Sequence, residues 1–267
     1  QGEIPHEFLN KIQEVGYRLN PFTMGVAEEL ERQGIAIGKF RPVINHVIPP
    51  KPVDIDTNEE SRTQWKRDAR EKRNLQANEA RKSCRTRMTM NIAREFRNDV
   101  WFLPFSYDYR GRAYPIPSFL TPQDTDFGKS LLISDKGAPI TDEGKDWLSF
   151  SVATCFGLDK ASWQERIDWC ADGTNRELIK RVATDPLGNI GDWENVDEPW
   201  QFLAACEEWW AIHSGKRVHT HLFVATDATC SGLQILAGMA RDKSTAQMVN
   251  VIGSDKPQDA YKVIAEK

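Results

Sequence analysis

The pattern of hydrophobic and polar positions along this chain changes near Val100. Before that point, long polar stretches with helical periodicity predominate, and a proline-rich segment between Arg41 and Thr57 interrupts them, because proline cannot occupy a helix interior. Residues 58–99 contain neither proline nor glycine, and Asn58 is a suitable N-cap. The first hundred residues are therefore predicted to be mainly helical, with a linker or extended arm followed by one or two long helices.

The segment that follows has a different character. Residues 100–122 are aromatic, apolar and rich in turn formers, which predicts short strands and turns. Helical patterns return in TDEGKDWLSFSVATCFG, where Thr141 is the predicted cap, and in EPWQFLAACEEWWAIHSG, which has Pro199 in its first turn and Gly215 after its end. The tryptophans of this last helix are predicted to lie in the core.

A short apolar run precedes a single aspartate near the end of the chain. Residues 222–225 are apolar and partly β-branched, and a polar turn containing Asp227 separates them from the helical pattern LQILAGMARD. The pattern predicts a buried strand, a turn and a helix. An aspartate at this position either caps the next helix or holds a cation at the edge of the sheet. Taken alone the pattern favours capping, and spacing assigns no second carboxylate.

Composition limits the classes of protein that the chain can belong to. Its 267 residues, 40% of them hydrophobic, can bury the core of one large domain or two ordinary ones. The net charge of −4 argues against a protein that coats nucleic acid along its whole surface. Five scattered cysteines without a Cys-x-x-Cys pair indicate neither a disulfide framework nor a zinc site, so a reducing cytosol fits best. The start QGEIPHEF has no signal-peptide core, no run reaches the roughly 18 apolar residues of a membrane span, and a piece of a longer chain is expected.

Positive charge is concentrated in the predicted long helices. Between Lys66 and Asn98, eleven lysines or arginines stand against four acids, a local net charge of +7. Most charge runs are solvated helix faces, but here the surplus is one-sided and apolar residues are sparse. This favours a helix that follows the phosphates of a nucleic acid, with Arg81 and Lys82 among its cations.

A second cationic feature is the stretch YDYRGRAY. Arg110 and Arg112 flank Gly111, so planar bidentate donors suited to phosphate stand beside a residue that permits a turn or a close backbone approach. The alternative is a β-turn with two solvated arginines, one of them paired with Asp108. Lys129, which precedes the apolar run SLLI, offers a possible second phosphate contact.

Several stretches of the chain together resemble the single-subunit DNA-dependent RNA polymerases of bacteriophages and mitochondria. They are DYRGRAYP, GKSLL, KGAPITDEGKDWL, EPWQFLAACEEW, ATDATCSGLQILAGMARD and VNVIGSDKPQDAYKVIAEK, and KPVDIDTNEESRTQWKRDAREKRNLQANEARKS is similar to thumb-region helices of the phage members. The resemblance implies an α+β, mainly helical fragment of a right-hand polymerase. Residues 1–98 would be a helical region with the thumb-like basic helices, and residues 99–267 the first part of the palm, without the fingers and the rest of the palm.

The resemblance also implies roles for individual residues. Asp227 would be the catalytic residue and would bind two Mg²⁺ ions, assisted by the backbone carbonyl of Ala228, while the second protein carboxylate lies in a later His-Asp motif outside this chain. Gly232 would leave room for the ribose 2′-hydroxyl, where related DNA polymerases carry a glutamate. Contacts with nucleic acid or nucleotide are expected from Arg110, Gly111, Arg112, Lys129, Gly232, Tyr261, Arg81 and Lys82.

The expected function is DNA-templated RNA synthesis by two-metal nucleotidyl transfer from ribonucleoside triphosphates. The implied partners are a DNA template, nascent RNA and the triphosphates, and the implied protein is a monomer without membrane contact, in the cytoplasm of a phage-infected cell or in the mitochondrial matrix. This segment alone is expected to be inactive. A DNA polymerase or reverse transcriptase of similar palm fold, a non-catalytic basic helical nucleic-acid-binding module and a degenerate structural homologue are the alternatives.

Overall fold

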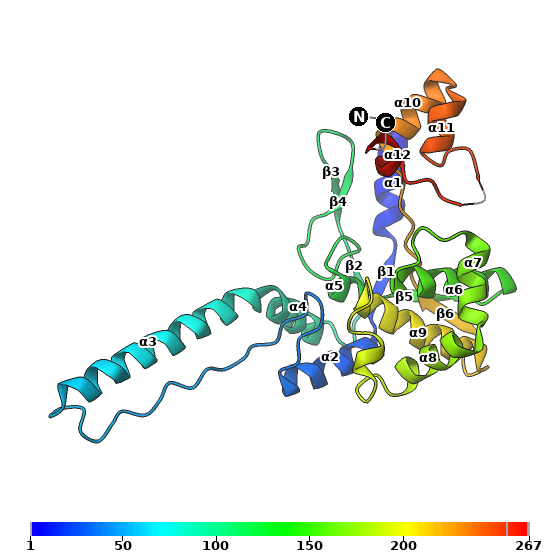
Figure 1. Cartoon of the computed structure of the whole chain (residues 1–267). Helices are drawn as coiled ribbons and strands as arrows, with labels where there is room; N and C mark the ends of the chain where they lie inside the picture. The colour runs from blue at the N-terminus through cyan, green and yellow to red at the C-terminus, as the bar shows by residue number, and fades with distance from the viewer. Residues whose placement is uncertain (1, 255, 266–267) are drawn as a thin grey trace. The chain divides into compact units, whose positions relative to one another are not determined.

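The computed structural model describes residues 2–254 and 256–265. These form two compact units, one that ends at Leu131 and one that begins at Leu132. Both units combine helices with short antiparallel strand pairs (Figure 1), so the expectation of a mainly helical α+β protein is confirmed. The assignment of residues 1–98 to a thumb-like region and of residues 99–267 to a palm stays a prediction.

The first unit begins with helices and adds its strands later. Its elements are α1 (Glu3–Gln13), β1 (Gly16–Leu19), α2 (Pro21–Gln33), α3 (Glu59–Lys82), α4 (Cys84–Glu95), β2 (Trp101–Phe102), β3 (Phe105–Tyr107), β4 (Ala113–Pro115) and α5 (Asp126–Ser130). Strand β1 lies in a region expected to be helical. It forms because it pairs antiparallel with the distant β2, where the rings of Tyr17 and Trp101 stack 6.5 Å apart.

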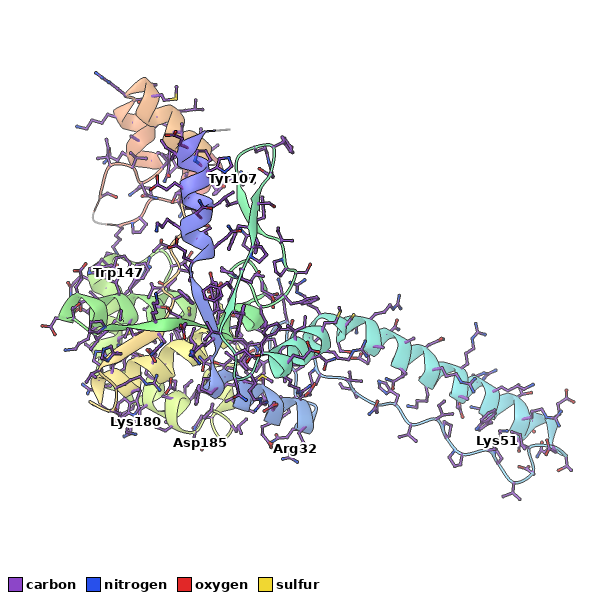
Figure 2. The ribbon with its side chains drawn as sticks, turned by 180° about the vertical axis from the view of Figure 1, so that it is seen from behind. Arg32, Lys51, Tyr107, Trp147, Lys180 and Asp185 are labelled. Carbon is purple, nitrogen blue, oxygen red and sulfur yellow. The ribbon has the colours of Figure 1, made fainter. Side chains whose placement is uncertain are left out.

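The long helices and the arm before them are confirmed. The side chain of Asn58 caps α3 by accepting hydrogen bonds from the backbone N–H groups of residues 60 and 61, at 3.0 and 3.2 Å. Residues 41–58 follow an irregular extended path beside α3 (Figure 1), and Figure 2 shows Lys51 on this arm. Trp65 Nε1 donates to the carbonyl of Pro49 at 2.8 Å, and Gln76 Oε1 accepts from the backbone of His46 at 2.8 Å. The arm is therefore fixed along one side of the helix.

The aromatic segment 100–122 forms short strands and turns, as predicted. Strands β3 and β4 make an antiparallel hairpin in which Phe105 pairs with Pro115 and Tyr107 with Ala113. The hairpin places the sequence DYRGR at its turn, between the two strands.

The second unit is a helical bundle with a strand pair. Its elements are β5 (Leu132–Pro139), α6 (Asp142–Phe156), α7 (Trp163–Ala171), α8 (Gly173–Thr184), the 3-10 helix η1 (Ile190–Asp192), α9 (Pro199–His213), β6 (His219–Leu222), α10 (Ser231–Ala240), α11 (Lys243–Met248) and α12 (Ala260–Ala265). The predicted helix signals are confirmed: Thr141 caps α6, Pro199 opens α9, and Gly215 follows its end with φ +73°.

The core of this unit is built around α9. Trp200 is completely buried and meets Trp193 edge to face, with ring centroids 5.6 Å apart, and Trp209 is 2% exposed. The prediction that the tryptophans of this helix lie in the core is confirmed for Trp200 and Trp209, whereas Trp210 is half-buried. Burial of such large apolar surfaces is the main stabilising contribution in a bundle of this kind. No helix in the described residues is both long and apolar enough to cross a membrane.

The strand predicted at residues 222–225 is wrong except for its first residue. Strand β6 spans His219–Leu222 and pairs antiparallel with β5, with Pro139 opposite His219 and Ile133 opposite Leu222. The pairing with β5 decides the position of the strand, and it ends at Leu222. Residues 223–228 continue as a mostly exposed loop.

Candidate functional site

Asp227 lies in the exposed loop between β6 and α10. Its Oδ1 accepts a hydrogen bond from the N–H of the next residue, Ala228, at 2.8 Å. The N-cap position of α10 is occupied by Cys230, which has φ +53° and makes no capping bond with its side chain. Capping of α10, which the sequence alone favoured for Asp227, is therefore wrong, and the carboxylate is left accessible on the loop.

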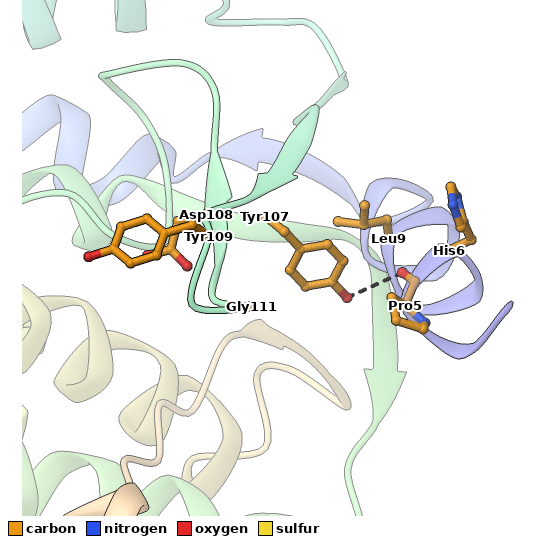
Figure 3. Close-up of a pocket in the computed structure, with 7 residues that line it drawn as sticks. All are labelled: Pro5, His6, Leu9, Tyr107, Asp108, Tyr109 and Gly111. Atoms are coloured by element: carbon orange, nitrogen blue, oxygen red, sulfur yellow. Dashed lines mark hydrogen bonds between the residues drawn. The ribbon is translucent and has the colours of Figure 1, made fainter. Parts of the chain in front are cut away.

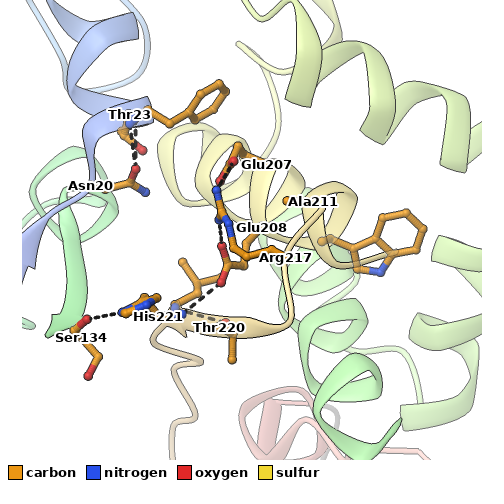
Figure 4. Close-up of polar contacts among 12 residues, drawn as sticks. Asn20, Thr23, Ser134, Glu207, Glu208, Ala211, Arg217, Thr220 and His221 are labelled. Carbon is orange, nitrogen blue, oxygen red and sulfur yellow. Dashed lines mark hydrogen bonds and ion pairs between the residues drawn. The ribbon is translucent and has the colours of Figure 1, made fainter. Parts of the chain in front are cut away.

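The strand that leads into this loop is fixed by a buried acidic side chain (Figure 4). Glu208 on α9 is 5% exposed, accepts a hydrogen bond from the backbone N–H of His221 at 3.0 Å and forms an ion pair with Arg217. Glu207 binds the same guanidinium at 2.8 Å, and the His221 ring contacts the carbonyl of Ser134 at 2.7 Å. Strand β6 is thus held to α9 and β5 immediately before the loop.

The far end of the loop is held by Asn250, which sequence reasoning did not single out. Its Nδ2 donates to Thr229 Oγ1 at 3.0 Å and to the carbonyl of Gln258 at 2.9 Å, while its Oδ1 accepts from the backbone N–H of Gln258 at 2.7 Å. Asn250 has φ +61°, a conformation that asparagine adopts more readily than most residues. In the sequence, only its residue type, which is typical of such turns, could have indicated it. One side chain therefore joins the Asp227 loop to the segment that leads into α12.

Tyr261 on α12 comes close to the same loop. A hydrogen bond with the Cys230 thiol raises the pKa of the Tyr261 phenol, and the negative charge of Asp227 acts in the same direction. At Gly232, on the first turn of α10, a Cβ atom would meet nothing within 4 Å. The structure thus brings Asp227, Ala228, Gly232 and Tyr261 into one region, with open space at the glycine.

The donor set at this loop is compatible with Mg²⁺ in chemical type. The Asp227 carboxylate and the Ala228 carbonyl are hard oxygen donors, which Mg²⁺ prefers. Within the described residues no cluster of three or more His, Cys, Asp or Glu side chains could hold a metal ion. The two residues can therefore supply part of a coordination shell.

The arginine stretch forms the turn of the β3–β4 hairpin. Asp108 Oδ1 accepts the backbone N–H groups of Arg110 and Arg112, both at 2.9 Å, and its Oδ2 pairs with Arg110 Nε at 3.0 Å. These bonds, first that from the Arg112 N–H, lower the pKa of the Asp108 carboxyl. Gly111 takes φ +79°, which glycine tolerates best. The β-turn with one paired arginine is confirmed, and the exposed Arg112 guanidinium has no ion-pair partner among the described residues.

A pocket of about 590 Å³ lies between this hairpin and α1 (Figure 3). Tyr107 donates a hydrogen bond from its hydroxyl to the carbonyl of Pro5 at 3.2 Å, and its ring lies 6.4 Å from that of Phe8. Leu9 and Tyr109 contribute apolar surface to the lining. The hairpin that carries the arginines is thus supported by α1.

Helix α3 presents a cationic face on one side. The spacing of Lys66, Arg70, Arg73 and Arg81 puts these side chains within one sector of the helix, and all four are exposed. The arm contacts a different sector, through Trp65 and Gln76. The arm therefore leaves the cationic row free to meet an anionic partner.

The local charge surplus is smaller than the sequence count indicated. Arg85 forms an ion pair with Asp124 at 2.6 Å, and Arg94 and Arg97 form ion pairs with Glu31 and Glu28 of α2. These acids lie outside the counted stretch, and tertiary packing brings them to it. The cationic character is accordingly concentrated on α3.

The remaining predicted contact residues also belong to the first unit. Arg81 and Lys82 are exposed at the end of α3, with Lys82 3.6 Å from Glu79, and Lys129 is half-buried in the last turn of α5. The candidate residues are thus distributed over both units, and the roles assigned to them stay predictions.

Comparison with known proteins shows a similarity to RNA polymerases. Residues 138–267 match the family model described as DNA-dependent RNA polymerase. The chain is 34% identical over 267 residues to the DNA-directed RNA polymerase of Enterobacteria phage K11, and 34% identical over 268 residues to T7 RNA polymerase of Escherichia phage T7. It is 30% identical over 262 residues to the mitochondrial DNA-directed RNA polymerase of Neurospora crassa.

These alignments cover 97–98% of this chain, but only 29% and 30% of the two phage proteins and 18% of the Neurospora protein. The resemblance to single-subunit RNA polymerases of phage and mitochondrial type is confirmed. The match to the family model is confined to residues 138–267, and the similarity to the individual polymerases extends through the preceding residues.

Proposed function

We propose that this chain is part of a longer DNA-directed RNA polymerase, which copies a DNA template into RNA from ribonucleoside triphosphates. The observation that carries the proposal is the loop at Asp227, an accessible carboxylate fixed at both ends, within the segment that matches the polymerase family. In the proposal, residues 1–98 include the thumb and residues 99–267 the first part of the palm.

In the proposed mechanism, the Asp227 carboxylate and the Ala228 carbonyl hold divalent cations. When bound, a pair of Mg²⁺ ions stabilises the attacking and leaving oxygens of an in-line phosphoryl displacement. Asn250 and Glu208 keep the loop in place from its two sides, so that the carboxylate needs little reorganisation during the reaction. Tyr261 would contact the incoming nucleotide beside the loop.

Selection of the sugar and binding of the nucleic acid involve other residues. The open space beside Gly232 would accommodate a ribose 2′-hydroxyl. The exposed row on α3 and Arg112 at the hairpin turn would bind backbone phosphates with little base preference, and Lys129 would add a contact. Base pairing with the template would supply sequence specificity. The implied protein is a monomer in the cytoplasm of a phage-infected cell or in the mitochondrial matrix.

Primer extension by the full-length polymerase that carries these residues tests the proposal. We expect template-dependent addition of ribonucleotides to an RNA primer, with deoxyribonucleotides used poorly. Gly232→Glu should reduce ribonucleotide addition far more than Gly232→Ala, because only the longer side chain fills the space for the 2′-hydroxyl. A preference of the wild-type enzyme for deoxyribonucleotides would favour a DNA polymerase, and template binding without nucleotide addition would favour a binding module.

A further inference from the structure

A second cavity of the first unit has a strongly cationic lining. It is about 320 Å³ in volume and lies where the end of α3, the start of α4 and the segment around residue 40 meet. Its lining includes Lys39, Arg41, Lys82 and Arg85. Four cationic side chains from three segments thus converge on one pocket.

Only part of this charge is neutralised by neighbouring acids. Arg85 binds Asp124, whose side chain is fully buried, and Lys82 lies 3.6 Å from Glu79 on the same helix. Lys39 and Arg41 form no ion pair with any described residue. The pocket therefore keeps a surplus of two positive charges, which favours occupation by an anion.

Threonine hydroxyls add uncharged polar groups to the lining. Thr86 and Thr89 of α4 both line the pocket, and Thr89 is 1% exposed. The Thr86 Oγ1 accepts the backbone N–H of Arg41 at 3.0 Å. Because a hydroxyl can donate a hydrogen bond to an oxygen of a bound ligand, Thr89 adds a donor beside the four cations.

We propose that this pocket binds a phosphate group, and that the phosphate belongs to the backbone of a nucleic-acid strand. Donors that approach from three segments suit the oxygens of a tetrahedral phosphate, which point in several directions. Lys82, in the lining, directly follows Arg81, the last member of the exposed cationic row on α3. A strand that follows this row reaches the pocket at its end. The choice of nucleic acid as the source of the phosphate rests on the proposed function.

The test is DNA binding by the full-length polymerase with two variants of the pocket. We expect the double variant Lys39→Gln/Arg41→Gln to weaken binding of a fluorescent single-stranded DNA by roughly tenfold at low salt, and to reduce the slope of log K against log salt by about 1–2. Thr89→Val, which keeps the shape of the side chain, should weaken binding about two- to threefold without changing the slope. Arg32→Gln, which removes an exposed arginine paired with Glu29 outside the pocket, is the control and should leave both unchanged.

Thermal unfolding of each variant shows that it has folded before its affinity is compared. Unchanged DNA affinity and salt slope in both pocket variants would overturn the proposal. Binding of inorganic phosphate, measured by calorimetry, distinguishes a nucleic-acid phosphate from a free phosphate compound. If the variants lose phosphate binding but keep DNA affinity, the pocket binds a free phosphate compound and the nucleic-acid assignment is overturned. RNA synthesis by the wild-type sample is recorded separately, so its absence rejects the proposed function whatever the affinities are.

Discussion

The bundle around α9 and the loop that carries Asp227 belong to the same unit but are stabilised in different ways. Helix α9 is almost entirely buried, with Trp200 and Phe202 at 0% exposure. Residues 223–228 are mostly exposed. The chain is anchored before them, where Glu208 accepts the His221 N–H, and after them, where Asn250 donates to Thr229. The proposed chemistry is therefore located where burial contributes least, and we expect that stability and catalysis can be altered separately.

The helices after the loop are intermediate in how much apolar surface they bury. Helices α10, α11 and α12 share a small core of Ala237, Ala246, Val249 and Ala260, against which Cys230 packs. Short side chains bury little area, so this cluster contributes less hydrophobic stabilisation than the tryptophan bundle does. The position of the loop therefore depends strongly on its individual hydrogen bonds.

The largest expected effect on stability comes from the bundle. Trp200→Ala should lower the free energy of unfolding by about 3–5 kcal/mol, because it removes a completely buried ring and leaves a cavity. Urea unfolding followed by circular dichroism measures this change. Trp163→Ala is the matched control, since Trp163 is 37% exposed and should cost much less. Equal costs at both positions would contradict the view that α9 organises the core.

A smaller effect is expected at the anchor of the loop. Asn250→Ala should cost about 2–3 kcal/mol, because it loses the hydrogen bonds to Thr229 and Gln258 and places alanine at positive φ. Asn250→Gly should cost about 1 kcal/mol less, since glycine accepts that backbone conformation.

Both Asn250 variants should also make the Cys230 thiol react faster with a maleimide. The Cys84 thiol, which is in the first unit, serves as the internal reference in peptide mapping. An unchanged rate at Cys230 together with wild-type nucleotide addition would show that Asn250 does not position the loop.

The smallest expected effect concerns an exposed ion pair between Lys256, in the segment before α12, and Glu165 on α7. The Lys256 ammonium, followed by the bond from the Ser162 N–H, lowers the pKa of Glu165 to about 2, from an ordinary value of 4.5. This contribution to stability is present above pH 4.5 and is lost as the pH falls toward 2. Glu165→Gln should therefore lose less stability between pH 5 and pH 3 than the wild type does, as urea midpoints would show, and an identical pH profile would contradict this.

The features that could be predicted from the sequence are those that local chemistry determines. Asn58 and Thr141 cap their helices, Pro199 opens α9, and the prolines of residues 41–58 exclude a helix, because each effect depends on a few adjacent residues. Asp227 and Tyr261 were selected together by resemblance, and the structure brings them close.

The features that were missed depend on partners far away in the chain. Strand β6 ends at Leu222 because its partner β5 determines the pairing, and apolar residues beyond it stay in a loop. The arginines of α4 and the residues after it lose their surplus charge to Glu28, Glu31 and Asp124, which no count within the stretch includes. Asn250 was missed because its contacts to Thr229 and Gln258 are known only once the chain is folded.

The most direct test of the proposed function is Asp227→Asn in the full-length protein, with single-nucleotide addition and thermal unfolding measured on the same sample. We expect nucleotide addition to fall by about a thousandfold or more, because the proposed anionic ligand of the cations is lost. The unfolding midpoint and the DNA affinity should stay near those of the wild type. Asp242→Asn, which alters a helix-capping aspartate nearby in the chain, should keep its activity. Wild-type rates of addition by Asp227→Asn would contradict the assignment of catalysis to this loop.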